Sequence, residues 1–323
     1  MSIAEEGWEL DIDSVVGEPY GLKYVLLRKL SRKSLLNTLT KFGNYSLMSG
    51  VGIVVEFREL GSYGASLGKL SKLIHYLLFM PSTHDLRAIN ELREAINYCD
   101  GLGISSPHYF DPNVLKELVN TTRRYRKLVL SHVSEVKEVH DLNDFDYLLK
   151  VGKPDAIIHG YWLSEDELLT AKELGVTVVI CPRSATWFLS GEPRIDLLYG
   201  LGINVCLGTD NAGWVSPDIW RELEFTALLM RRYCGLIDAK WLLKLVTTNV
   251  SSIIGIRNVI SEGELANITL LNSELINLNV VRNKYLSIVK RGCPEAVEAV
   301  LINGGVAYDR RGRLKALRSS LRN

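Results

Sequence analysis

Residues suited to hydrolytic metal chemistry follow three apolar runs of this sequence. His132 and Glu135 come after the run 127–130, His159 ends the run 156–158, and Asp210 follows the run 205–207. Imidazole nitrogens and carboxylate oxygens are ligands for Zn²⁺ and Fe²⁺, and such an ion lowers the pKa of bound water toward ~7. A glutamate beside the ion has the right chemistry for moving protons. The four residues therefore indicate a metal-dependent hydrolytic site.

The elements that must position these residues are short runs rich in Val, Ile and Leu, each followed by a longer segment of helical period. Runs apolar on both faces and alternating with helices are typical of parallel strands, so the sequence predicts an α/β barrel or a doubly wound sheet. Of the two we expect a TIM-type (β/α) barrel. Working residues of such barrels lie at the carboxyl ends of the strands, where all four candidates fall. The seven predicted strands are Val51 to Phe57, Leu73 to Met80, Gly101 to Ser105, Leu128 to His132, Ala156 to His159, Val176 to Cys181 and Ile203 to Gly208.

A closed barrel of this kind has eight strands, and the one not recognisable is the first. The segment 32–48 reads as a helix, and the segment 3–24 before it reads as irregular. The first and last predicted strands would then have unpaired edges, unless Trp8 to Ile12 or another chain fills the gap. Such edges invite self-association, so a homo-oligomer is one expected state.

The pattern changes after a helix predicted over Ala239 to Ile254. Short alternating strands follow at 264–271, 299–302 and 306–308, the last two joined by the turn Asn303, Gly304, Gly305. We therefore expect a barrel domain over residues 1–257 and part of a β-sandwich with a basic tail over 258–323.

Composition excludes several classes of function. The chain is 47% hydrophobic and 23% charged, as in ordinary globular proteins, and no apolar run reaches the ~18 residues needed to span a bilayer. A net charge of +1 provides no general attraction to nucleic acid or to acidic membranes, so the expected partner is a small-molecule substrate. The N-terminus has no secretory signal pattern, so the expected location is cytoplasmic. Five scattered cysteines without CxxC exclude the cytidine type of zinc deaminase.

Four motifs in order along the chain resemble the amidohydrolase superfamily. They are the HxxE of residues 132–135, the HG of 159–160, the CPRS of 181–184 and the GTDN of 208–211. Their order is most similar to the branch of cytosine deaminases, guanine deaminases, adenosylhomocysteine deaminases and chlorohydrolases. The segment 260–271, ISEGELANITLL, resembles the point where that branch enters its β-sandwich.

The resemblance implies one divalent metal, zinc or iron, and hydrolysis of a C–N bond on a nucleobase-like heterocycle. It implies that His132, Asp210 and His159 are metal ligands, and that His159 also polarises the water or the substrate. Asp210 would accept a proton from the attacking water, and Glu135 would be the proton shuttle. Ring-opening or dehalogenating hydrolysis by the same metal remains an alternative.

Three further residues are candidates for substrate contact. His108, in a Pro-His pair, resembles a substrate-contacting residue of the branch, although the Ser-Ser-Pro before it equally suits a plain turn. Trp187 and Trp214 follow the last two strands and would either stack on a flat ring or pack in the core. Of the remaining histidines, we expect His75 in the core, His84 as a helix cap and His140 on a surface loop.

The sequence departs from the family pattern at one end. The superfamily's HxH ligand pair at the end of the first strand occurs nowhere in this chain, and the sandwich strands that precede it are also missing. We therefore expect weak metal binding. One interpretation places the start of the chain just after a lost HxH; another is a natural, metal-free barrel that binds but does not catalyse. Ala185 and Asn267 also replace the usual Asn and Asp of two motifs.

Overall fold

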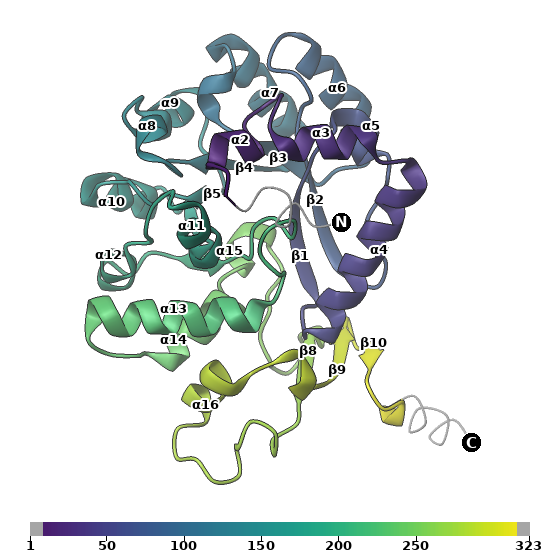
Figure 1. Cartoon of the computed structure of the whole chain (residues 1–323), viewed down its shortest axis with the longest axis vertical. Helices are drawn as coiled ribbons and strands as arrows, with labels where there is room; N and C mark the ends of the chain where they lie inside the picture. The colour runs from purple at the N-terminus through teal and green to yellow at the C-terminus, as the bar shows by residue number, and fades with distance from the viewer. Residues whose placement is uncertain (1–8, 315–323) are drawn as a thin grey trace.

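The computed structural model describes residues 9–314 and contains a curled sheet of parallel strands wrapped by helices (Figure 1). The seven strands pair in chain order, each with its sequence neighbour, as in a TIM-type barrel. All seven predicted strands are confirmed, with ends that differ by at most two residues. They are β1 (Ile53–Arg58), β2 (Ile74–Phe79), β3 (Gly101–Ile104), β4 (Leu128–Val133), β5 (Ala156–His159), β6 (Thr177–Ile180) and β7 (Val205–Leu207).

Helices cover the outer face of this sheet. Their inward faces and the outward faces of the strands form the main core, in which each fully buried Leu or Phe contributes roughly 1.5–3 kcal/mol to the free energy of unfolding. The helices between β1 and β7 are α5 (Gly61–Ala65), α6 (Arg87–Ala95), α7 (Pro112–Arg124), α8 (Lys137–His140), α9 (Asp144–Val151), α10 (Glu165–Glu173), α11 (Pro182–Phe188) and α12 (Ile195–Gly200), with the 3-10 turn η1 (Pro107–Tyr109). The capping box of Ser164 and Glu167 opens α10.

Three helices follow β7: α13 (Ile219–Cys234), α14 (Ala239–Leu245) and α15 (Ser251–Ile254). The single helix predicted over 239–254 is therefore wrong, because it is broken at 246–250. β-Branched residues and Asn249 weaken the helix there. The Asn249 side chain instead donates to the carbonyl of Val205 in β7 at 2.8 Å.

The segment before β1 is more regular than the sequence indicated. It forms α2 (Ile12–Val16), α3 (Leu22–Lys29) and α4 (Arg32–Met48), and only the last was predicted. Asp11 caps α2 by accepting the Ser14 N–H at 2.8 Å. Of the suggested gap-filling strand, Trp8 lies outside the described residues, and residues 9–12 form no strand.

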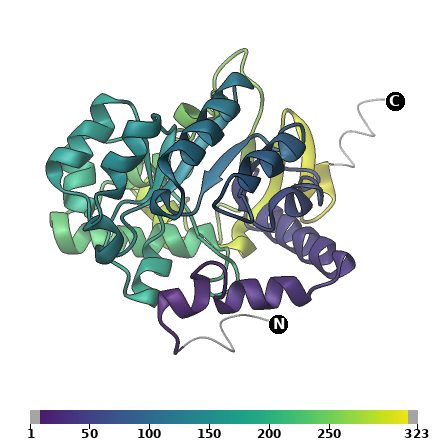
Figure 2. The ribbon, with the colours of Figure 1, turned by 90° about the horizontal axis from the view of Figure 1, so that it is seen from above.

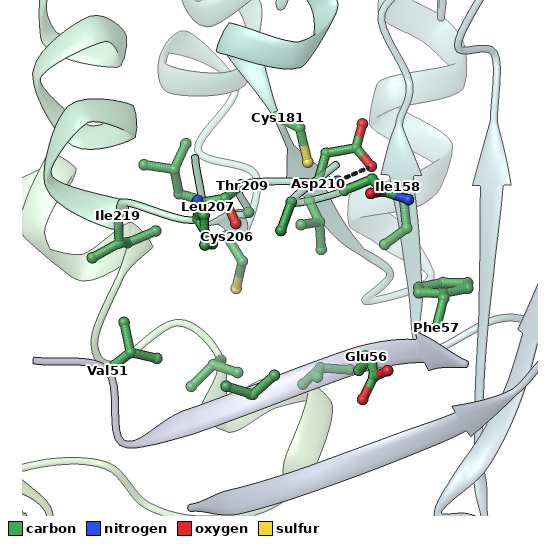
Figure 3. A pocket seen from close by; sticks show the side chains of 18 of the residues that line it. Val51, Glu56, Phe57, Ile158, Cys181, Cys206, Leu207, Thr209, Asp210 and Ile219 are labelled. Carbon is green, nitrogen blue, oxygen red and sulfur yellow. Dashed lines mark hydrogen bonds between the residues drawn. The ribbon is translucent and has the colours of Figure 1, made fainter. Parts of the chain in front are cut away.

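The sheet is open where an eighth strand would close it. Within residues 9–314, β1 pairs only with β2, and β7 only with β6. A cavity of about 1120 Å³ runs along this gap. Figure 3 shows Val51 and Phe57 on its β1 side, with Cys206 and Leu207 facing them from β7.

A small antiparallel sheet follows the barrel, in the order β10-β9-β8. Its strands are β8 (Ile268–Leu271), β9 (Val297–Ile302) and β10 (Gly305–Asp309), accompanied by α16 (Lys284–Arg291) and the turn η2 (Pro294–Ala296). The turn between β9 and β10 has positive φ at Asn303 (50°) and Gly304 (77°), as a tight hairpin requires. The predicted β appendage is thus confirmed. No helix within residues 9–314 is both long and apolar enough to cross a membrane.

Candidate metal and catalytic site

The polar residues at the ends of β4, β5 and β7 meet at one mouth of the barrel. Ligand atoms of Glu135, His159 and Asp210 all lie within 4.8 Å of one another. Nε2 of His159 is 3.4 Å from Oε2 of Glu135. The His132 ring stacks on the His159 ring with centroids 5.1 Å apart, but His132 is not a member of the tight three-residue group.

Left-handed backbone turns these side chains into the mouth. Ser134, His159 and Asp210 have φ values of 47°, 75° and 57°, a region that non-glycine residues seldom adopt. Such strain costs roughly 1–3 kcal/mol per residue and persists only where surrounding contacts hold it. At Ser134 the contact is Asp144, whose carboxylate accepts the Ser134 N–H at 2.6 Å and the Ser134 hydroxyl at 2.7 Å. The neighbouring Glu135 is thereby fixed at the mouth.

The hydrogen bonds of Tyr161 select the tautomer of His159. The Tyr161 hydroxyl donates to the Cys181 carbonyl and accepts the Cys181 N–H, both at 3.2 Å. Because its one hydrogen is used, it accepts from Nδ1 of His159 at 3.0 Å. Nε2 then has a free lone pair directed at the cluster, as a metal-ligating histidine needs. Tyr161 stands two residues after His159, but nothing in the sequence reveals this contact.

The Asp210 carboxylate is held at both oxygens. Oδ2 accepts the Ser184 hydroxyl at 2.5 Å, and Oδ1 accepts the Asn211 N–H at 2.7 Å. Ser184 in turn accepts the indole N–H of Trp214 at 3.1 Å. The CPRS motif contains Ser184, but sequence reasoning assigned it no role.

Burial sets the protonation states of the cluster. Burial lowers the pKa of His132 and of His159 to about 4, so both imidazoles are neutral at pH 7. Burial raises the pKa of Glu135 to about 7, and the negative charge of Asp210 is the second cause. Glu135 is therefore poised both to give and to take a proton near neutral pH.

This donor set fits a divalent metal ion. Neutral imidazole nitrogen and carboxylate oxygen are the ligand types that zinc accepts at about 2.0–2.2 Å, and three such atoms are already grouped. Glu135 belongs to that group, whereas His132, which was expected to be a ligand, does not.

The residues expected to contact substrate lie in different surroundings. Trp214 is buried and lines the cavity. His108 and Trp187 are not among the residues that line it. The His108 ring packs on Tyr147, 4.6 Å between centroids, and Trp187 is 45% exposed. Figure 3 shows Phe57 at the cavity wall; its ring lies 4.6 Å from that of His132.

The other histidines are structural. His75 is buried in β2, as expected, and accepts the Leu70 N–H through Nδ1 at 2.8 Å. His140 ends α8, where Nδ1 lies 3.2 Å from the Ser134 hydroxyl, and is not on a loop. His84 does not cap α6, since Leu86 holds that position; its Nε2 lies 2.6 Å from a carboxylate oxygen of Glu18.

The contact of His84 belongs to a cover over the mouth, made by α2, α3 and the turn between them, residues 12–29 (Figures 1 and 2). Tyr24 donates to Glu18 at 2.8 Å, and Lys23 forms an ion pair with Glu59 just after β1. Lys23 is almost fully buried and is the cation whose charge acts on both His132 and Glu135. The sequence contained no signal for this cover.

Comparison with known proteins identifies the family. Residues 46–307 match the amidohydrolase family, and the chain belongs to it. It is 26% identical to a putative aminohydrolase of Methanothermobacter thermautotrophicus over 91% of this chain and 79% of that protein. It is also 26% identical to a 5-methylthioadenosine/S-adenosylhomocysteine deaminase of Thermococcus onnurineus, over 68% of this chain and 58% of that protein. A zinc-containing adenosine deaminase structure from Xanthomonas campestris superposes with a TM-score of 0.78 at 17% identity, over 92% of this chain and 76% of that one.

Proposed function

We propose that this protein is a metal-dependent hydrolase that removes the amino group of a nucleobase-like nitrogen heterocycle. The observation that carries the proposal is the convergence of Glu135, His159 and Asp210 at the carboxyl ends of the strands, with His132 stacked beside them. Family membership and the deaminase among its relatives support the substrate class.

His132, His159 and Asp210 would hold the ion, zinc or iron, with Glu135 beside them. Once bound, the metal supplies Lewis acidity that makes water nucleophilic near neutral pH. The neutral state of both imidazoles favours binding, because a protonated ring has no lone pair to offer.

The protons are moved by two carboxyl groups. Asp210 takes a proton from the attacking water as its oxygen bonds to the ring carbon that bears the amine. Glu135, with its pKa near 7, gives a proton to the adjacent ring nitrogen. The proton held by Asp210 then passes to the amino group, the C–N bond breaks and ammonia leaves, and the hydroxyl proton of the product returns to Glu135. Water is consumed, and the ring keeps a carbonyl in place of its amine.

The cavity suits a flat ring carrying an apolar group. The residues that line it include Phe57, Trp214 and Ile158. Aromatic and aliphatic walls with a few convergent polar groups are typical of small-molecule sites. We assign Trp214 to the wall against which the heterocycle lies.

The proposed location is the cytoplasm, and the proposed assembly is a homo-oligomer. All five cysteines are free, which agrees with a reducing cytoplasm. The edges of β1 and β7 that have no partner strand within residues 9–314 favour association of two or more copies.

The test is turnover of the purified chain loaded with Zn²⁺ or Fe²⁺. Adenosine, 5′-deoxyadenosine, 5-methylthioadenosine, guanine and cytosine are offered separately, and released ammonia is measured. We expect ammonia from at least one, with Asp210→Asn inactive and the surface variant Asp146→Asn fully active. Halide release from a chlorinated heterocycle, or a ring-opened acid without ammonia, would favour the rival hydrolytic chemistries. A folded chain that binds no metal would favour the non-catalytic barrel.

A further inference from the structure

A chain of two hydrogen bonds leads from the barrel wall to the Asp210 carboxylate. Trp214, in the loop after β7, donates its indole N–H to Ser184 Oγ at 3.1 Å. Ser184, in the first turn of α11, donates to Oδ2 of Asp210 at 2.5 Å. Ser184 and Trp214 are both buried, so no bulk water competes for these bonds.

The direction of the chain follows from the chemistry of its members. An indole N–H only donates, and a serine hydroxyl has one hydrogen and two lone pairs. Once Trp214 occupies a lone pair of Ser184, the hydroxyl hydrogen is left to point at Asp210. The short distance agrees with a hydroxyl donating to a charged carboxylate.

The chain also restricts rotation of the carboxylate. Oδ2 accepts a hydrogen bond from Ser184 of α11, and Oδ1 accepts one from the backbone N–H of the next residue, Asn211. A carboxylate oxygen of Asp210 is then presented to the space shared with Glu135 and His159.

Trp214 is itself clamped by apolar contacts. The Phe188 ring meets it edge-on, with centroids 5.0 Å apart, and Val215 packs beside it. Val15 of α2, which is 1% exposed, and its neighbour Val16 belong to the same apolar cluster. The cover over the mouth thus packs on Trp214, the first donor of the two hydrogen bonds.

We propose that Ser184 and Trp214 are positioning residues that aim the Asp210 carboxylate at the metal, and that α2 holds Trp214 in place for this task. The inference rests on the proposed function, in which Asp210 is a ligand. Partners that orient a ligand through a hydrogen bond are worth about 10–100-fold in metal affinity.

The experiment measures the Zn²⁺ dissociation constant of the purified full chain by competition with a chromophoric chelator. The variants are Ser184→Ala, Trp214→Phe and their double, each checked by its melting temperature. We expect Ser184→Ala and Trp214→Phe each to weaken Zn²⁺ binding by about tenfold or more. Because both act through one bond to Asp210, the double variant should be no weaker than Ser184→Ala alone, whereas independent effects would multiply.

A matched control is Trp162→Phe, which removes another indole N–H bond, to the Ser190 carbonyl at 2.8 Å, at a residue that does not line the cavity. It should leave Zn²⁺ affinity unchanged. Wild-type affinity in Ser184→Ala and Trp214→Phe, or multiplying losses in the double variant, would overturn the inference while Asp210→Asn still lost zinc. A wild-type chain that binds zinc no better than Asp210→Asn would instead remove the proposed function, and this inference with it.

Discussion

Arg183 and Glu222 join α11 to α13 behind the site. The backbone N–H of Arg183 donates to Oε1 of Glu222 at 2.8 Å, and its guanidinium Nη1 lies 3.5 Å from Oε2. The same guanidinium donates to the Ser216 carbonyl at 3.2 Å, in the loop that follows Asp210. The pair therefore fixes the start of α11, one residue before Ser184.

This pair predicts a pH dependence of stability. Glu222 is fully buried, and burial raises its pKa from 4.5 to about 7 against the opposing effect of Arg183. Between these pH values the folded chain keeps a proton that the unfolded chain releases, so the stability from Glu222 is complete below about pH 4.5 and is lost as pH rises through 7. In urea unfolding from pH 5 to 8, Glu222→Gln should lose less free energy of unfolding than the wild type. Parallel curves for the two proteins would contradict this, and the exposed Glu165→Gln serves as control.

Glu135 offers a test of its role as shuttle. Glu135→Gln keeps the size and an oxygen of the side chain but cannot give and take the proton. We expect zinc to be retained and kcat to fall by at least ~10² on whichever substrate releases ammonia. Metal content and initial rates measured on one preparation decide it. Loss of zinc in this variant would mean that Glu135 is a ligand, in line with its place in the three-residue group.

Asp144 should matter for both stability and activity. Asp144→Ala leaves the buried N–H of Ser134 without its partner and removes one of two partners of the Ser134 hydroxyl, at a cost of about 1–3 kcal/mol in the free energy of unfolding. It also frees the loop that presents Glu135, so kcat should drop. Asp146→Ala, exposed on the same helix, should change neither quantity. Equal urea midpoints for the two variants would refute the role of Asp144.

The ion pair of Lys23 and Glu59 predicts a rescue. Both side chains are largely buried, so Lys23→Met should release the cover by leaving the buried Glu59 carboxyl group without its cation. Proteases should then cut faster between residues 17 and 31. Replacing both residues with Met should restore most of the protection, because an apolar pair has no unpaired charge. A double variant as sensitive as Lys23→Met would show that the pair does not hold the cover.

The strands and the four strand-end residues were predictable because both depend on local pattern. Buried parallel strands are apolar on both faces, and His132, His159 and Asp210 stand where such runs end. The helices α2 and α3 were not predictable from the sequence, because elements of five and eight residues are too short for a periodic signal. Hydrogen bonds such as Ser184 to Asp210 join residues 26 apart, so only the packed fold reveals them.

The open edge of the sheet has a consequence for local unfolding. In a closed ring, a strand can leave only by breaking two ladders, whereas β1 and β7 each have one among the residues that the structure describes. β7 is three residues long, so it should fray before the interior strands and exchange its amide hydrogens fastest. Asp210 thus stands at the end of the least anchored strand. The side-chain hydrogen bonds from Asn249 to Val205 and from Ser184 to Asp210 therefore hold β7 and the residues after it in place, where backbone pairing alone gives little support.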